Sequence, residues 1–194
     1  MTKNILLVGV GGQGTITASK LLTLGLLASG YDVKMSEIHG MSQRGGSVSS
    51  HVRYNDDGPV YSPVISRGEA DILVSFEEME ALRWIDYLNP EGIVVVNKET
   101  IPGLKVLVGE QTYPEGILDQ LSRTAKTMVV DGRTEAGKLG NSKVTNVILL
   151  GVIARYMKLE HIDWNKIIEE NVKPQFAELN KKAFMVGYNL SIKA

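Results

Sequence analysis

The sequence contains no cysteine among its 194 residues. This absence excludes disulfide bonds, thiolate zinc sites, a cysteine nucleophile and any cysteine-ligated iron–sulfur cluster held by this chain. Histidine is also scarce: only His39, His51 and His161 occur, and none has a metal-ligand spacing such as H-E-x-x-H. We therefore expect no metal site built by this chain alone.

The sequence also lacks a charge excess and long apolar runs. Its 21 Lys and Arg residues balance 22 Asp and Glu residues, so no net charge favours nucleic acid or an anionic membrane surface as a partner. No run approaches the roughly 18 apolar residues of a membrane span, and the apolar stretch after Met1–Asn4 is too short for a signal peptide. We expect a cytoplasmic protein with a single domain over residues 1–194 and no nucleic-acid or membrane partner.

Apolar and glycine-rich segments alternate in the order typical of α/β proteins. A strand is expected at 4–8, a glycine turn at 9–14, a helix at 15–29 and a second strand at 32–38, which together suggest a βαβ crossover. Further strands are expected at 70–76, 92–97, 105–108 and 127–130, and further helices at 77–88, 116–123, 141–159 and from Trp164, capped by Asp163. The pattern predicts a mostly parallel, doubly wound (Rossmann-like) sheet with helices on both faces.

An inserted β excursion near residues 47–65 interrupts this rhythm. Residues 47–54 alternate, with Val48, Val52 and Tyr54 on one side, which predicts a half-buried strand. A turn cluster at 55–59 follows, and Pro63 allows the segment 60–65 to be at best an edge strand or an extended connection.

A glycine motif, G-x-G-x-x-G, lies between the first strand and the first helix, which is the context that phosphate binding needs. The residues that we expect to bind a cofactor there are Gly9, Gly11, Gly12, Gln13 and Gly14. A dinucleotide site also needs an acidic residue about 20 positions on, at the tip of the second strand. Glu37 is near that tip, 23 residues beyond Gly14. The alternative is that the glycines serve only tight strand–helix packing.

A polar, glycine-rich loop, His39–Ser47, follows the second strand and is the most informative segment of the chain. Its glycines permit backbone angles that other residues avoid, and its polar side chains suit a phosphate or a carboxylate. The residues that we expect to bind a ligand here are Ser42, Gln43, Arg44, Gly45 and Gly46. The loop should face the glycine turn and share an anion site with it, unless it is a surface loop that only solvates itself.

Other polar residues also follow expected strands, notably Asn97, Lys98 and the run Asp131–Arg133. This is where α/β proteins build their sites, but residues in such positions are more often helix caps or solvated loop residues. No nucleophile with its base and no acid–base pair stands out, so we assign no catalytic residue to this chain.

Four segments carry a resemblance to a known family. They are GVGGQG from Gly9, EIHGMSQRGGSVSSHVR from Glu37, GEADILVSFEEMEALR from Gly68 and GNSKVTNVILLGVIARY from Gly140. Together they resemble the gamma-type subunit of the 2-oxoacid:ferredoxin oxidoreductases, most closely the beta subunit of the indolepyruvate type. The resemblance extends over essentially the whole chain, and the SQRGG loop at this distance behind the glycine motif is its specific part.

This resemblance implies oxidative decarboxylation of an arylpyruvate with coenzyme A and oxidised ferredoxin, giving an acyl-CoA, carbon dioxide and reduced ferredoxin. Thiamine diphosphate, magnesium and the iron–sulfur clusters would belong to a larger catalytic subunit, which agrees with the missing cysteines. This chain would share a coenzyme A site and complete the partner's active site through Gln43 and Arg44. Two other classes stay open: a stand-alone NAD(P)-binding Rossmann oxidoreductase and a noncatalytic α/β interaction protein.

Overall fold

The computed structural model describes residues 1–40 and 45–190. The strands of its sheet are β1 (Lys3–Val10), β2 (Asp32–His39), β3 (Ser47–Asn55), β4 (Ala70–Ser75), β5 (Leu88–Asn97) and β6 (Lys126–Val130). The helices are α1 (Thr15–Ala28), α2 (Glu78–Arg83), α3 (Leu104–Leu107), α4 (Ile117–Thr124), α5 (Gly132–Lys138), α6 (Thr145–Tyr156), α7 (Trp164–Asn171) and α8 (Ala177–Asn189). Three short 3-10 helices are η1 (Ile85–Tyr87), η2 (Ser142–Val144) and η3 (Pro174–Phe176).

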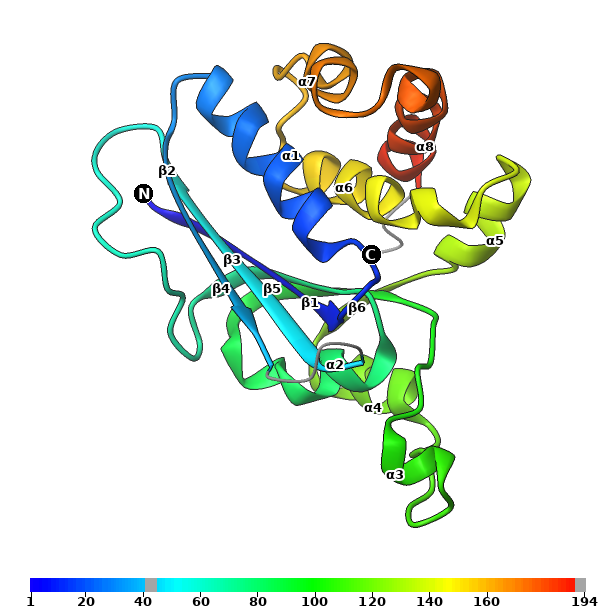
Figure 1. Cartoon of the computed structure of the whole chain (residues 1–194). Helices are drawn as coiled ribbons and strands as arrows, with labels where there is room; N and C mark the ends of the chain where they lie inside the picture. Colours follow the sequence, from blue (N-terminus) through cyan, green and yellow to red (C-terminus); the bar gives the residue numbers. More distant parts are fainter. Residues whose placement is uncertain (41–44, 191–194) are drawn as a thin grey trace.

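The sheet has the order β2-β3-β1-β4-β5-β6, in which β1, β4, β5 and β6 pair in parallel. Helices α1, α6, α7 and α8 lie over one face, and α2 and α4 lie over the other (Figure 1). Each face has its own apolar core, one around Leu22 and Ile148 and the other around Leu73 and Leu121. The expected mostly parallel, doubly wound sheet with helices on both faces is therefore confirmed.

The inserted excursion is more central than the sequence indicated. Strand β3 pairs antiparallel with both β1 and β2, so it separates two strands that the βαβ pattern suggested as neighbours. The expectation of a half-buried strand was wrong, because Ser49, Ser50 and His51 are each only 1% exposed. Helix α1 packs on one face of β3, and Trp84 and Tyr87 pack against His51 on the other, so even its polar side chains are buried. Residues 60–65 form an extended connection, the second of the two expected alternatives, because no strand forms there.

His51 shows how this strand tolerates a polar side chain in the core. Its Nδ1 accepts a hydrogen bond from the backbone N–H of Ile65 at 3.2 Å, and Trp84 packs edge-on at 6.2 Å between ring centroids. Burial lowers the pKa of His51, so the imidazole is held neutral as a structural acceptor. His51 thus anchors the 56–66 connection to the sheet.

Element boundaries differ from expectation where packing overrides the local pattern. The expected helix 77–88 divides into α2 and η1. Strand β5 begins earlier than expected, at Leu88, because residues 89–92 form a bulge opposite Asp71. The expected helix 141–159 divides into η2 and α6, and α5 was not expected from the sequence. The cap of α7 is confirmed: the Asp163 carboxyl accepts from the backbone N–H of Lys166 at 3.1 Å. No helix in the described ranges is long and apolar enough to cross a membrane.

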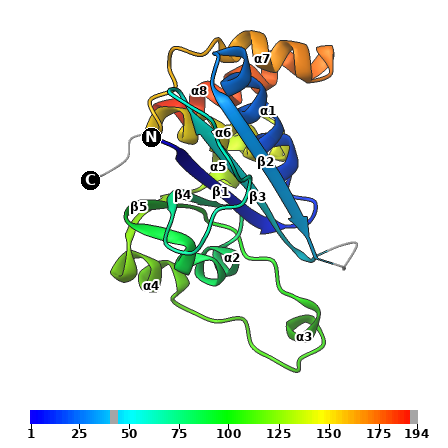
Figure 2. The same cartoon turned by 90° about the vertical axis from the view of Figure 1, so that its left-hand side faces the viewer.

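The strand expected at 105–108 was wrong, since these residues belong to α3 and the turn after it. Figures 1 and 2 show α3 projecting away from the sheet on an extended segment, which we call the arm (residues 101–115). Branched apolar residues favoured a strand, but the arm has no neighbouring strand to pair with. Leu104 and Leu107 are instead 74% and 70% exposed.

A buried carboxyl group fastens the base of the arm. Glu77 is 1% exposed, and its carboxyl oxygens accept hydrogen bonds from the backbone N–H groups of Glu80 at 2.9 Å and Ile101 at 3.1 Å. The Tyr113 hydroxyl donates a third bond to it. Burial, followed by the bond to Glu77, raises the pKa of Tyr113 and keeps its proton in place to donate. One side chain thereby joins the end of β4, α2 and both ends of the arm.

Substituting Glu77 by alanine should destabilise the protein strongly, because three donors, one of them buried and two partly buried, lose their acceptor together. We expect Glu77→Ala to lower the free energy of unfolding by roughly 2–4 kcal/mol, measured by urea denaturation. Glu115→Ala is the matched control, because that side chain is exposed at the last residue of the arm. Equal stability of the two variants would contradict this role for Glu77.

Helices α6 and α8 pack so closely that two positions admit only glycine. A Cβ on Gly151 would collide with the carbonyl oxygen of Phe184, and a Cβ on Gly187 would collide with that of Ile148. We expect Gly187→Ala to cost about 1–3 kcal/mol of stability through overpacking, measured by thermal and urea unfolding. The control is Gly137→Ala in α5, where a Cβ meets nothing within 4 Å; it should stabilise by about 0.5–1 kcal/mol. A neutral Gly187→Ala variant would refute the close packing.

Candidate functional site

The candidate site lies where β1, β4, β5 and β6 end at their carboxyl termini. Helix α1 leaves β1 toward one face of the sheet, and α2 leaves the neighbouring β4 toward the other face (Figure 1). Crevices in doubly wound proteins form at such a switch point. The glycine turn occupies the β1 side of this crevice.

Different structural constraints require glycine at different positions of the turn. Gly12 and Gly14 adopt positive φ angles of 103° and 86°, which other residues avoid. At Gly14 a Cβ would also approach Asn146 Nδ2 to 2.7 Å. Gly9 lies inside β1, and there a Cβ would stand 2.9 Å from the Cβ of Phe76. Packing thus explains Gly9, whereas Gly12 and Gly14 shape the turn itself.

Gln13 is already bonded within the protein. Its Oε1 accepts from the backbone N–H of Val10 at 2.8 Å, while Nε2 donates to the carbonyl of Phe76 at 2.8 Å and to Glu99 Oε2 at 3.2 Å. These bonds fix the turn against the ends of β4 and β5. The sequence-based role of Gln13 in cofactor binding stays a prediction, and the structure adds a positioning role.

The start of α1 is open to an anion. Gly14 is its N-cap, no side chain in the described residues caps it, and no acidic residue occurs in its first turn. The first N–H groups of a helix lack partners within the helix and carry a partial positive charge. This 14-residue helix therefore offers amide donors beside the glycine turn.

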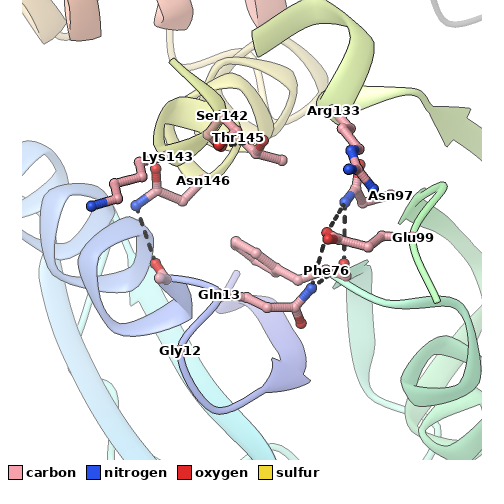
Figure 3. A pocket seen from close by; sticks show the side chains of 11 residues that line it. Gly12, Gln13, Phe76, Asn97, Glu99, Arg133, Ser142, Lys143, Thr145 and Asn146 are labelled. Atoms are coloured by element: carbon pink, nitrogen blue, oxygen red, sulfur yellow. Dashed lines mark hydrogen bonds between the residues drawn. The ribbon is translucent and has the colours of Figure 1, made fainter. Parts of the chain in front are cut away.

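A cavity of about 520 Å³ opens beside this turn (Figure 3). It is lined by Gly12, Gln13, Gly14, Phe76, Asn97, Glu99, Arg133, Ser142, Lys143, Thr145 and Asn146. Its two cationic side chains stand on opposite sides: Lys143 on the side of Asn146, and Arg133 on the side of Asn97 and Glu99 (Figure 3). The cavity thus brings together residues from the ends of all four parallel strands and from the start of α6.

Asn97 organises the far side of this cavity. It is fully buried; its Oδ1 accepts from the backbone N–H of Gly132 at 3.0 Å, and its Nδ2 donates to Glu99 Oε2 at 3.1 Å. A Cβ on Gly132 would stand 2.7 Å from Asn97 Oδ1, so glycine is needed for α5 to begin there. The cap interpretation is confirmed for Asp131, which accepts from the backbone N–H of Thr134 at 3.0 Å. Asn97, in contrast, is a buried side chain that bonds to several neighbouring segments.

The polar loop connects β2 to β3 as a hairpin. Gly40 donates its N–H to the carbonyl of Ser47 at 3.1 Å, and Gly11 donates to the carbonyl of Gly46 at 2.9 Å. The structure therefore brings the end of the loop against the glycine turn, as the sequence suggested. Gly45 has a positive φ of 76°. Three of the predicted binding residues, Ser42, Gln43 and Arg44, lie outside the described residues.

Glu37 does not occupy the position that a dinucleotide ribose requires. Because β3 intervenes, Glu37 faces Ser50, which in turn faces Leu7 of β1. Two strand spacings, about 10 Å, therefore separate Glu37 from β1. Its carboxyl instead accepts a bond from the Ser19 hydroxyl at 3.2 Å. This geometry counts against the NAD alternative.

Sequence reasoning missed several residues that line the cavity, namely Glu99, Lys143 and Asn146. Lys143 and Asn146 were missed because the segment 141–159 is mostly apolar and predicts one helix. The signal that could have indicated a turn is Asn141, whose side chain accepts a hydrogen bond from the backbone N–H of Lys143 at 3.0 Å. Within residues 1–40 and 45–190, no cluster of three or more histidines and carboxylates could hold a metal ion.

Comparisons with known proteins show which family this chain resembles. The chain is 40% identical to the indolepyruvate oxidoreductase subunit IorB of Pyrococcus horikoshii, over 95% of this chain and 93% of that protein. It shares its fold with the gamma subunit of a keto/oxoacid ferredoxin oxidoreductase from Geobacter sulfurreducens, at a TM-score of 0.70, 22% identity and 96% coverage of both chains.

A third similar protein is a longer chain. It is the 2-oxoglutarate:ferredoxin oxidoreductase of Magnetococcus marinus, solved with 2-oxoglutarate, coenzyme A and succinyl-CoA bound. The TM-score is 0.72 at 16% identity, and the match covers 96% of this chain but 30% of that one. The family model for pyruvate ferredoxin/flavodoxin oxidoreductases matches residues 4–190. The resemblance seen in the sequence is thereby confirmed, and the chain belongs to the pyruvate ferredoxin/flavodoxin oxidoreductase family.

Proposed function

We propose that this chain is the accessory subunit of a thiamine-diphosphate-dependent 2-oxoacid:ferredoxin oxidoreductase of the indolepyruvate type. The 40% identity to an indolepyruvate oxidoreductase subunit over nearly the whole chain supports this assignment. The complex would convert an arylpyruvate, coenzyme A and oxidised ferredoxin to an acyl-CoA, carbon dioxide and reduced ferredoxin in the cytoplasm. The isolated chain would be inactive.

The cofactors of this reaction fit a partner better than this chain. Cysteine ligands for iron–sulfur clusters are absent from the sequence, so the clusters would lie on a larger catalytic subunit, together with thiamine diphosphate and magnesium. Thiamine diphosphate would supply the decarboxylation chemistry there. Ferredoxin would then bind the complex rather than this chain.

This chain would contribute to a coenzyme A cleft shared with the partner. The hydrogen bond from Gly11 to Gly46 carries the proposal, because it joins the glycine turn and the polar loop into one surface next to the open start of α1. Backbone amides and a guanidinium are the donors that a diphosphate prefers. A family member whose structure holds coenzyme A contains the same fold within its longer chain. Gln43 and Arg44 would complete the partner's active site from this surface.

Copurification tests the assembly. Tagged at its amino terminus and isolated from its native cell, this chain should bring down a larger, brown, cysteine-rich subunit that contains iron and thiamine diphosphate. Absorbance near 400 nm and thiamine analysis would identify it. A chain recovered alone and binding NADH in calorimetry would instead favour the stand-alone dehydrogenase.

Arg44→Ala tests the shared site in the assembled complex. Loss of one charge-assisted bond to a phosphate, roughly 1.5–3 kcal/mol, corresponds to a rise of about 10- to 100-fold in the KM for coenzyme A. Arg123→Ala is the control, because Arg123 is exposed on α4, which covers the other face of the sheet. If Arg44→Ala leaves both this KM and the turnover untouched, the loop has no such role.

A further inference from the structure

The cavity beside the glycine turn has two cationic sites instead of one. Lys143 lies on the side of the turn and α1, and Arg133 lies on the opposite side, next to the Asn97–Glu99 pair (Figure 3). A ligand with one compact anionic group would use only one of these sites. The separation therefore indicates a ligand with two anionic groups joined by a polar spacer.

We infer that Arg133 binds the 3′-phosphate of coenzyme A, while the glycine turn and Lys143 bind its diphosphate. This inference rests on the proposed function and deepens it, because it assigns a specificity-determining residue within the shared cleft. The nucleotide end of coenzyme A carries exactly two such anions, separated by one ribose. An NAD molecule carries only the diphosphate.

The diphosphate side is built from backbone amides and one ammonium group. Gly12 and Gly14 have no side chain to obstruct the approach, and Asn146 Nδ2 fixes the turn by donating to the Gly14 carbonyl at 3.4 Å. Lys143 precedes Asn146 by one helical turn and is exposed. A cation on this side of the cavity would add to the partial positive charge at the start of α1.

On the opposite side of the cavity, the backbone before Arg133 is held in place and the guanidinium group is free to bind a ligand. Arg133 follows Gly132, whose backbone is bonded to the buried Asn97 at 3.0 Å. The guanidinium is exposed and forms no ion pair with any carboxylate of residues 1–40 and 45–190. Its planar fork can bind a phosphate through two parallel hydrogen bonds.

Glu99 lies on the same side of the cavity as Arg133 but does not cancel its positive charge. Its Oε2 already accepts hydrogen bonds from Gln13 and Asn97 at 3.2 and 3.1 Å, and these bonds partly neutralise the carboxylate charge. Its other oxygen is an acceptor for the ribose hydroxyl adjacent to the 3′-phosphate. Among the described lining residues, two cations against one carboxylate leave a net positive charge. A volume of about 520 Å³ lies within the range of small-molecule and cofactor pockets.

Dephospho-CoA tests this assignment, because it lacks only the 3′-phosphate. In the assembled complex, Arg133→Gln should raise the KM for coenzyme A about tenfold or more and abolish the preference of the wild type for coenzyme A over dephospho-CoA. Lys143→Gln should raise both KM values by similar factors and keep the preference. Arg123→Gln on α4 should change neither. Equilibrium binding of the two ligands to the same complexes gives a readout independent of turnover.

The remaining outcomes separate this inference from the proposed function. If Arg133→Gln weakens the binding of coenzyme A and of dephospho-CoA equally, the 3′-phosphate is bound elsewhere and only the inference fails. The same holds if Arg133→Gln changes the binding of neither ligand while Arg44→Ala weakens the binding of both. If Arg133→Gln, Lys143→Gln and Arg44→Ala all leave the binding of both ligands unaffected, coenzyme A does not bind this chain, and the shared coenzyme A cleft of the proposed function fails as well. Each variant must first assemble with its partner, as size-exclusion chromatography will show.

Discussion

The pairing of β3 with both β1 and β2 is the constraint on which the site depends. Its register places Val10 opposite Ser47, so the hairpin loop must return beside the glycine turn, and Gly11 then bonds to Gly46. Shifting this register by one residue would turn His51 and its polar neighbours to the opposite face. The inserted strand, which looks like an interruption of a parallel fold, is therefore what brings two distant glycine-rich segments into one surface.

Buried polar side chains then connect the strand ends to one another. Gln13 ties the turn to β4 and β5, Asn97 ties β5 to β6 and α5, and Glu77 ties β4 to the arm. Because unpaired buried polar groups are costly, such bonds hold the crevice in one geometry. A partner subunit would thus meet a preformed edge, with exposed cations above a rigid base.

The parallel strands, the glycine turn and the Asp163 cap were predictable because local chemistry decides them: apolar runs, turn residues and a capping carboxylate. Three features were not. Residues 105–108 resemble a strand but have nothing to pair with, so they form α3. Residues 47–54 alternate like a surface strand, but α1 on one face and Trp84 and Tyr87 on the other bury their side chains. Lys143 and Arg133 share a cavity through tertiary packing alone, which no sequence spacing reports.

The same physical features explain why binding and catalysis would reside on different chains. A phosphate-binding surface needs backbone amides, glycines and cations, and this chain supplies them at the edge of a stable sheet. Electron transfer through iron–sulfur clusters needs cysteine ligands, and the sequence has no cysteine to offer. A crevice that only binds a ligand gains no rate by itself. It gains a function when it fixes one end of a substrate so that the reactive end reaches a neighbouring subunit.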